Sequence, residues 1–352
     1  MEVQEAKQFS SEKIFKHLDR VAVWQAGGCP WPITAEIFLT DKCTHRCPNC
    51  FYREQRGKNV MDTEFAKSVI DQLVECGLRG LTFSGGGEPL CHPDAIDLIE
   101  YAGSKIDTAL ITNGSLIHDR IECYRLLSSC QWIRVSLDAG SPEMFKKTHG
   151  LGEKEFEHVL NNIKALVDVR NRANLKCTIG VGYLTSRETL DGMIDFAKLA
   201  SELGVDYAQF RPLLRTFSEK EDPDFCAKEV YAIIDMCKKY EHKGFEILYS
   251  KHKYDAALTG TLRDYDRCEG ANFATTVGAD GGVYLCCHTA GLEEFKIGDL
   301  HKSTFYEIWT SGKRREIIER LDVSKCPSLC RCNAINSTLA RISKVAVHKN
   351  FL

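Results

Sequence analysis

Three cysteines near the start of the chain, Cys43, Cys47 and Cys50, have the spacing CxxxCxxC. They follow a short apolar segment, residues 35–39, that predicts a buried strand. Thiolates bind the irons of a 4Fe-4S cluster, which normally takes four cysteines, so three cysteines leave one iron free for another ligand. The alternative is a structural zinc site with a fourth ligand such as His45.

A glycine-rich turn, Ser84-Gly85-Gly86-Gly87-Glu88-Pro89, follows the second predicted strand, residues 80–84. Glycines allow a ligand to approach the backbone closely, and the carboxylate of Glu88 is placed to accept hydrogen bonds from a cation. Proteins with a parallel sheet place their chemistry at the C-terminal ends of the strands. The turn and the three cysteines are therefore expected to serve one site.

Six more cysteines fall within a short C-terminal stretch: Cys268, Cys286, Cys287, Cys326, Cys330 and Cys332. The first two flank Gly281 in the spacing CX12GX4C, and the sequence Asp280-Gly281-Gly282 predicts a hairpin turn. This density of cysteines predicts a second metal site. Four cysteines suit zinc as well as an iron-sulfur cluster, so both metals are possible on the count alone.

The segments that must position these cysteines alternate between strand and helix patterns from about residue 34 to residue 214. Six such units favour a parallel sheet, because parallel neighbours need crossover connections that are usually helical. The predicted strands are residues 35–39, 80–84, 108–112, 132–137, 176–183 and 207–211. Thr185 and Glu188 predict a capping box before the last helix, and residues 11–24 predict one helix ahead of the sheet. The predicted fold class is α/β.

The composition is that of a globular protein, with 43% hydrophobic and 27% charged residues. A formal net charge of -3 gives no field that would hold a polyanion, so no nucleic acid is expected as a partner. No apolar run is long enough to span a membrane and no signal peptide is evident, so a cytoplasmic protein without a membrane partner is expected. Five cysteines in apolar-periodic segments are expected to be small buried hydrophobes: Cys76, Cys123, Cys130, Cys177 and Cys237.

The CxxxCxxC motif after the first strand and the GGEP-like turn after the second together resemble the radical S-adenosylmethionine (SAM) superfamily. The resemblance covers most of the chain and implies a partial (β/α)6 TIM-like barrel. It also implies a 4Fe-4S cluster whose open iron binds SAM, and a 5′-deoxyadenosyl radical that abstracts hydrogen from a substrate. A flavodoxin or ferredoxin-type protein is the implied electron donor. One departure is Asn49, where many members place an aromatic residue against the adenine.

The same resemblance implies which side chains and turns bind SAM. The implied residues are Gly86, Gly87, Glu88, Asn113, Ser136 and Asp138. The first three match the turn that binds the amino group, and Asn113 is similar to the substrate-side edge of the family's site. Ser136 and Asp138, after the fourth strand, resemble its contacts to the ribose and carboxylate.

The C-terminal cysteines resemble the SPASM and Twitch modules that follow many radical SAM domains, as do Gly298-Asp299-Leu300 and Glu307-Ile308-Trp309. Such modules hold auxiliary 4Fe-4S clusters. Six cysteines are too few for the two clusters of a full SPASM module, so one auxiliary 4Fe-4S cluster is expected. The implied ligands are Cys268, Cys286, Cys326 and either Cys330 or Cys332, with Cys332 preferred.

Five segments are expected along the chain. They are an N-terminal helical extension (1–33), the radical SAM partial barrel (34–215), a linker with a helix and a strand (216–266), a small α+β auxiliary cluster module (267–340) and a tail (341–352). A charged run from residue 219 to residue 224 marks the linker.

Three reactions are compatible with this arrangement. An auxiliary cluster with four cysteines has no free iron for a substrate and suits the transfer of one electron, which favours oxidation of an alcohol in a small sugar-like or aminocyclitol-like substrate. The second is epimerisation, with the Cys287 thiol returning a hydrogen atom, unless Cys287 merely packs behind the hairpin. The third, peptide modification, ranks lower because only 33 residues precede the first strand. A non-enzymatic electron carrier with two clusters would need no GGEP-like turn.

Substrate contacts are expected where the sixth strand ends, at Arg211 and Arg215. A guanidinium there could anchor a hydroxyl-rich or anionic group or assist proton loss, or it could pair with the acidic linker. Tyr183 is expected either in the core or facing SAM, and His288 is expected at the surface.

Overall fold

The computed structural model of the chain describes residues 10–213, 227–259, 263–327 and 329–343. One sheet of ten strands runs through these residues in the order β10-β9-β8-β1-β2-β3-β4-β5-β6-β7. The strands are β1 (Thr34–Phe38), β2 (Gly80–Ser84), β3 (Asp107–Thr112), β4 (Trp132–Ser136), β5 (Thr178–Thr185), β6 (Tyr207–Pro212), β7 (Glu246–Tyr249), β8 (Ala274–Val277), β9 (Gly282–Tyr284) and β10 (Lys296–Asp299).

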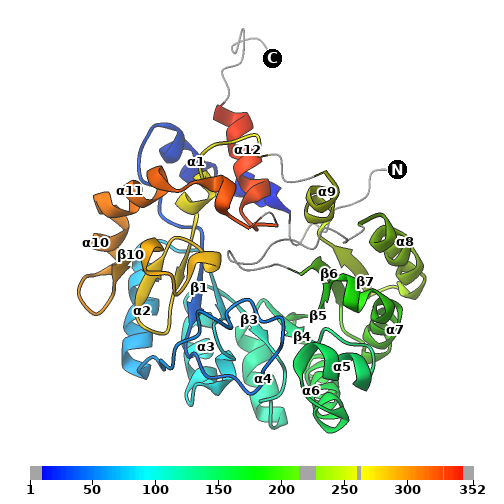
Figure 1. The fold of residues 1–352 in the computed structure, drawn as a ribbon. Coiled ribbons are helices and arrows are strands. Elements are labelled where there is room, and N and C mark those ends of the chain that lie inside the picture. Colours follow the sequence, from blue (N-terminus) through cyan, green and yellow to red (C-terminus); the bar gives the residue numbers. More distant parts are fainter. Residues whose placement is uncertain (1–9, 214–226, 260–262, 328, 344–352) are drawn as a thin grey trace.

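Helices line the outer side of this curved sheet, and the N-terminal and C-terminal helices lie together at one end of it (Figure 1). The helices are α1 (Leu18–Gln25), α2 (Thr63–Glu75), α3 (Ala95–Gly103), α4 (Arg120–Ser129), α5 (Pro142–His149), α6 (Glu153–Arg172), α7 (Met193–Leu203), α8 (Ala227–Cys237), α9 (Lys251–Thr259), α10 (Phe305–Thr310), α11 (Gly312–Arg320) and α12 (Asn333–Ser343). The α/β class and the six predicted strands, β1 to β6, are confirmed, with strand bounds within two residues of those expected.

The two faces of the sheet carry different side chains. On the face covered by helices, the strand residues are apolar and fully buried: Ile37, Phe83, Leu110, Val135, Val181 and Phe210. The opposite face, the inner face, carries polar and charged side chains from β1, β2, β4 and β6: Glu36, Ser84, Arg134, Ser136, Gln209 and Arg211. Paired residues of neighbouring strands point to the same side, so the register places these six on one face.

The sheet continues beyond the expected limits of the barrel. β7, which falls in the expected linker 216–266, pairs in parallel with β6. β8, which falls in the expected module 267–340, pairs in parallel with β1, and β9 and β10 follow as antiparallel strands. The predicted hairpin turn joins β8 to β9, and Gly281 there has a φ of 74°, a conformation that favours glycine. The second cysteine region therefore extends the sheet of the barrel.

The N-terminal segment packs on the C-terminal part of the chain. The single helix predicted for residues 11–24 is divided into a 3-10 helix, Ser11–Lys16, and α1. A small core cluster joins the two ends of the chain: Ile14, Val21, Phe273 and Leu339. This contact fixes the first turns of the chain against the segment that carries the C-terminal cysteines.

One local prediction is wrong by a single residue. The capping box predicted at Thr185 and Glu188 is formed instead by Ser186 and Thr189, because Thr185 is the last residue of β5. The helix consequently begins with a 3-10 turn, Arg187–Gly192, before α7.

The burial of the side chains agrees with the sequence-based predictions for five cysteines and differs from them at His288. The five cysteines expected to be small hydrophobes are all buried: Cys76, Cys123, Cys130, Cys177 and Cys237. Tyr183 lies in the core and donates its hydroxyl to the Thr189 carbonyl over 2.5 Å. The surface position expected for His288 is wrong, because it is only 7% exposed and its ring contacts that of Phe51. Among the described helices, none is long and apolar enough to cross a membrane.

Gly180 in β5 gives a test of how closely the inner face is packed. A Cβ at Gly180 would lie closer than 3.0 Å to the ring of Tyr207 on the paired strand β6. Gly180→Ala is expected to lower the free energy of unfolding by about 1–3 kcal/mol, because the core around Tyr207 would be overpacked. Gly80→Ala is the matched control, since its Cβ would meet nothing closer than 3.9 Å. Equal denaturation midpoints for the two variants would contradict this packing.

Candidate functional site

The loop after β1 holds Cys43, Cys47 and Cys50, each partly exposed. Burial raises the pKa of the Cys43 thiol, and burial and then the charge of Asp138 raise that of Cys47 to about 12. Arg56 donates from Nη2 to the Cys50 sulfur over 3.1 Å. Thiolates at Cys43 and Cys47 therefore need a bound metal to stabilise their charge, as cluster ligands have.

The separation of the sulfur atoms distinguishes a cluster from zinc. Tetrahedral zinc with Zn–S bonds of about 2.3 Å holds its sulfurs roughly 4 Å apart. Within the described part of the chain, Cys43, Cys47 and Cys50 do not form a group whose sulfurs all lie within 4.8 Å of one another. His45 groups instead with Cys47 and His149. The three cysteines are thus not gathered with His45 around one point, as a tetrahedral zinc site would require.

The ring of His149 is already engaged by the protein. Its Nε2 lies 3.0 Å from the Ser136 carbonyl and its Nδ1 lies 2.9 Å from the Thr148 hydroxyl. Burial lowers the pKa of His45 to about 3, and neither of its ring nitrogens has a hydrogen-bond partner among the described residues. His45 therefore stays neutral beside the cysteine loop.

The glycine-rich turn after β2 packs directly on the cysteine loop. A Cβ at Gly87 would lie closer than 3.0 Å to the Lys42 carbonyl oxygen, so only glycine fits there. The backbone N–H of Glu88 donates to the same carbonyl over 2.8 Å. A Cβ at Gly86 would lie 3.2 Å from Asp41 Oδ1. The turn and the loop are thus brought together as the sequence predicts.

The Glu88 side chain is buried and bonded to the protein itself. Its Oε1 accepts from the Thr112 hydroxyl over 2.6 Å and from the Leu90 backbone N–H over 3.2 Å. Its Oε2 accepts from the Asn113 backbone N–H over 2.7 Å. Burial raises the pKa of this carboxyl to about 7, although these three donors oppose the shift. Glu88 therefore ties the turn after β2 to the end of β3, and a direct contact with SAM stays a prediction.

Asn113, Ser136 and Asp138 lie at the same edge of the sheet. Asn113 donates from Nδ2 to the Thr44 hydroxyl over 2.9 Å, and the same nitrogen lies 3.9 Å from the Cys43 sulfur. Asp138 has a φ of 46°, and its Oδ1 accepts from the Leu184 backbone N–H over 2.6 Å. The structure therefore gathers all six implied SAM residues around the cysteine loop, and their contacts to SAM remain predictions.

The C-terminal cysteines also come together. The charges of Cys268 and Cys330 act on both Cys286 and Cys326, which places these four in one group. Cys332 hydrogen-bonds with both Cys268 and Cys330 through its side chain, and its backbone N–H donates to the Cys330 sulfur over 3.4 Å. Because Cys330 and Cys332 both reach the group, the choice between them as the fourth ligand stays a prediction.

Cys287, next to Cys286, contacts a pair of charged residues at the inner face of the sheet. Its sulfur accepts from Arg331 Nη1 over 3.6 Å, and the same nitrogen of Arg331 pairs with Glu36 of β1. Glu36 in turn accepts from the Ser84 hydroxyl over 2.7 Å. Burial raises the pKa of the Cys287 thiol well above its usual value, so the thiol keeps its hydrogen. A catalytic role of Cys287 stays a prediction.

Several residues of the site are not evident from the sequence. Arg211 lies on the inner face as expected, whereas Arg215 falls outside the described residues. The charged residues that join Arg211 on or beside this face are Glu36, Arg134, Lys253 and Arg331. Glu36 and Arg134 interrupt apolar strands, and that interruption is the signal that could have revealed them.

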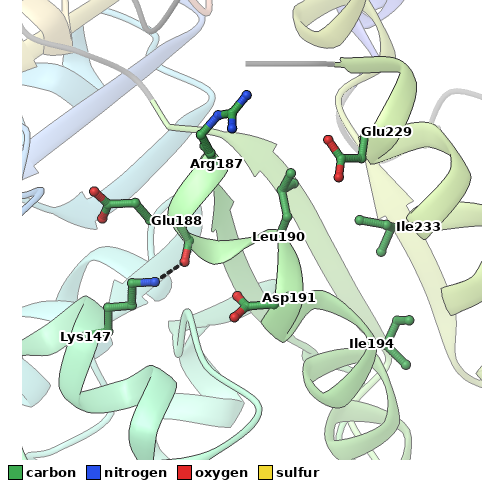
Figure 2. Close-up of a pocket in the computed structure, with 8 residues that line it drawn as sticks. All are labelled: Lys147, Arg187, Glu188, Leu190, Asp191, Ile194, Glu229 and Ile233. Carbon is green, nitrogen blue, oxygen red and sulfur yellow. Dashed lines mark hydrogen bonds between the residues drawn. The ribbon is translucent and has the colours of Figure 1, made fainter. Parts of the chain in front are cut away.

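A separate pocket of about 480 Å³ lies on the outer side of the barrel, between α5, α7 and α8 (Figure 2). Its lining residues are Lys147, Arg187, Glu188, Leu190, Asp191, Ile194, Glu229 and Ile233. Lys147 donates to the Glu188 carbonyl across this pocket. None of the predicted site residues lines it, so it is distinct from the cysteine site.

Comparison with known families agrees with this geometry. The model of the Radical SAM superfamily matches residues 37–217, about half of the chain. The chain belongs to the radical SAM superfamily. A second match, to the iron-sulfur cluster-binding domain SPASM, covers residues 268–333. Members of the superfamily are enzymes, and the two matched domains bind SAM, a 4Fe-4S cluster and auxiliary iron-sulfur clusters. The residues present fit these groups, since three partly exposed thiols lie in one loop that packs directly on the glycine-rich turn.

Proteins of similar sequence have names that indicate different roles. The AdoMet-dependent heme synthase of Methanosarcina barkeri is 26% identical over 311 residues, which cover 78% of this chain and 81% of that protein. The mycofactocin maturase MftC of Mycolicibacterium smegmatis is 24% identical over 310 residues, which cover 86% and 76%. These names do not point to one shared substrate.

Solved structures share the fold. Streptococcus suis SuiB bound to the precursor peptide SuiA superposes with a TM-score of 0.67 at 15% identity, covering 94% of this chain and 78% of that one. The enzyme anSMEcpe with bound AdoMet gives a TM-score of 0.61 at 19% identity, covering 82% and 83%. The partial barrel with an added C-terminal iron-sulfur module is thus confirmed as the fold.

Iron content tests the count of clusters. The reconstituted protein is expected to hold about eight irons, because two 4Fe-4S clusters carry four each. The variant Cys43→Ala/Cys47→Ala/Cys50→Ala is expected to keep about four irons, held by the C-terminal cysteines. Iron and zinc are measured together by plasma mass spectrometry. About twelve irons would require two auxiliary clusters, and zinc in place of iron in the triple variant would contradict the auxiliary cluster.

The hydrogen bonds of Glu88 predict that Glu88→Gln destabilises the protein. A glutamine has one oxygen and one amide, so either the Leu90 or the Asn113 backbone N–H would lose its acceptor. The variant is expected to lose about 1–3 kcal/mol of stability, the cost of a buried unsatisfied donor. Chemical denaturation measures this loss, and Glu64→Gln at an exposed position of α2 is the control. Unchanged stability of Glu88→Gln would contradict the bracing role.

Proposed function

We propose that this radical SAM enzyme oxidises a small substrate by two electrons, with the auxiliary cluster as the electron acceptor. When bound, SAM and its cluster supply a 5′-deoxyadenosyl radical for hydrogen abstraction, and the auxiliary cluster supplies a site for one electron. The protein holds the substrate between the two groups of cysteines. The observation that carries the proposal is the contact between the chain segments that carry these two groups.

Tyr52 makes the central contact between the two groups of cysteines. It lies two residues after Cys50, and its hydroxyl donates to the Cys287 carbonyl over 3.0 Å. The neighbouring Phe51 ring lies 5.4 Å from the ring of His288, in an edge-on contact. The segment that follows the first cysteines therefore touches the segment that carries Cys286 and Cys287, which supports transfer of an electron over a short path.

The ion pair between Arg331 and Glu36 supports a small substrate. Arg331 lies between Cys330 and Cys332, and it reaches Glu36 on the inner face of β1. The C-terminal segment thus covers part of the inner face and limits the space that a substrate can occupy. The names of the relatives include a maturase and a heme synthase, so the substrate class is proposed from the residues of this chain.

Anaerobic turnover tests the proposed oxidation. The reconstituted enzyme is incubated with SAM, dithionite in place of a flavodoxin or ferredoxin-type donor, and a metabolite extract, and the products are analysed by mass spectrometry. A product lighter than its substrate by two hydrogen atoms is expected, with one 5′-deoxyadenosine formed for each product. The ratio of this product to 5′-deoxyadenosine is expected to fall at least tenfold in Cys268→Ala/Cys286→Ala, because the electron acceptor is lost.

The control for this experiment is Cys76→Ala, a buried cysteine outside both groups. It is expected to keep the wild-type ratio of product to 5′-deoxyadenosine. A modified peptide in place of a small product, or a ratio that the loss of Cys268 and Cys286 leaves unchanged, would refute the proposal.

Epimerisation is the second candidate, favoured by the position of Cys287. Its buried neutral thiol faces Arg331 and Glu36 and can return a hydrogen atom to a substrate radical. Turnover in deuterated water separates the two reactions. Epimerisation would give a product of unchanged hydrogen count that carries solvent deuterium, and Cys287→Ser would abolish that label.

A further inference from the structure

Two arginines of the inner face meet above Gly182 in β5. Arg134 comes from β4 on one side and Arg211 from β6 on the other. A Cβ at Gly182 would lie 3.5 Å from Arg211 Nη2 and 3.9 Å from Arg134 Nε, so both guanidinium groups reach one point. Gly182 places no side chain between them.

Among the residues that the structure describes, no carboxylate forms an ion pair with either guanidinium group. Arg134 is 7% exposed and donates from Nη1 to the neutral Gln209 over 3.0 Å. Neither Arg134 Nε nor Arg211 Nε has a hydrogen-bond partner among the described residues. Asp138 is the carboxylate whose charge acts on both, and its Oδ1 already accepts from the Leu184 backbone N–H. A charge held away from water without a close counter-ion is costly, so a bound anion would stabilise this pair.

Lys253 in α9 adds a third positive charge to this group. Burial, and then the charge of Arg211, lower the pKa of Lys253 to about 8. Burial, and then the charge of Arg134, lower the pKa of Arg211 to about 9. The three cations therefore repel one another in a buried setting, and a bound anion would relieve that repulsion.

We propose that the substrate carries an oxyanion, a carboxylate or a phosphate, that binds between Arg134 and Arg211 with Lys253 beside it. Guanidinium groups bind both kinds of oxyanion through paired N–H donors. Asp138 lies near these arginines and also near Cys47, so a substrate anchored here extends toward the residues implied for SAM. This inference rests on the proposed function, because it names the substrate class of the same inner face.

Anion binding to the reconstituted enzyme tests the inference without turnover. Inorganic phosphate and malonate are titrated separately by anaerobic calorimetry, and at least one is expected to bind. Arg134→Met and Arg211→Met are each expected to weaken that binding at least tenfold. Arg120→Met, on the exposed side of α4, is the control and is expected to stay within twofold of wild type.

Thermal unfolding shows whether the variants fold and whether the arginines repel each other. In anion-free buffer Arg211→Met is expected to raise Tm by about 2 °C, because it removes a partly buried charge that faces other positive charges. A purely structural role of Arg211 would lower Tm instead. If Arg211→Met does not fold, Arg211→Lys replaces it in the binding test. This variant keeps the charge but loses the paired N–H donors, so it is expected to weaken anion binding at least threefold.

The tighter of the two probes indicates whether the substrate group is a phosphate or a carboxylate. The inference is overturned if neither probe binds or if both methionine variants bind them as wild type does. A parallel loss of SAM affinity would place the arginines at the carboxylate of SAM and would also overturn it. Oxidised product without anion binding contradicts this inference alone, whereas anion binding without oxidised product contradicts the proposed function.

Discussion

Strand β1 is held between β2 and β8 by two parallel pairings, and the site depends on both. The pairing with β2 aligns Phe38 with Ser84, and the pairing with β8 aligns Ile37 with Val277. As a result, the first cysteine loop, the glycine-rich turn and the hairpin that leads to Cys286 all begin at one edge of the sheet. A shift of either pairing by one residue would exchange the two faces of that strand and move Glu36 or Ser84 away from the inner face.

The inner face holds charged side chains away from water, and the free-energy cost of this must be offset elsewhere in the structure. Fully burying an apolar side chain stabilises a protein by about 1.5–3 kcal/mol, and the helix-covered face of the sheet is apolar in every strand from β1 to β6. That large core offsets the cost of holding Arg134 and Glu88 away from water. Glu88 is satisfied by three donors of the protein, whereas Arg134 has a neutral partner. The hydrogen bonds of Glu88 are therefore satisfied within the protein, as expected of a structural residue. The charge of Arg134 is not neutralised by its hydrogen-bond partner, as expected of a residue that binds a ligand.

The sequence predicts local elements well because their signals are local. The six strands follow from short apolar runs, and the meeting of the cysteine loop with Gly87 follows from the rule that parallel strands end at one edge. The pairing of β8 with β1 joins segments more than two hundred residues apart, so no local pattern specifies it. His288 is buried by contact with Phe51, a residue far away in the sequence. The local sequence around His288 does not reveal this contact and therefore predicts a surface position. The shift of the capping box by one residue reflects the extension of β5 to Thr185 by its pairing with β6.

The position of the arginine pair bears on which reaction follows hydrogen abstraction. Arg134 and Arg211 lie on β4 and β6, whereas Cys287 contacts Arg331 at the β1 side of the inner face, and Lys253 interacts with Arg211 and Cys287 alike. Transfer of a hydrogen atom requires the reacting atoms to be about 3–3.5 Å apart, while an electron can cross a gap between groups that do not touch. A small substrate anchored between the arginines as proposed would lie beside Lys253, on which the charges of both Arg211 and Cys287 act. The proposed oxidation needs only electron transfer from its radical to the auxiliary cluster, whereas epimerisation would also require the Cys287 thiol to touch the radical carbon.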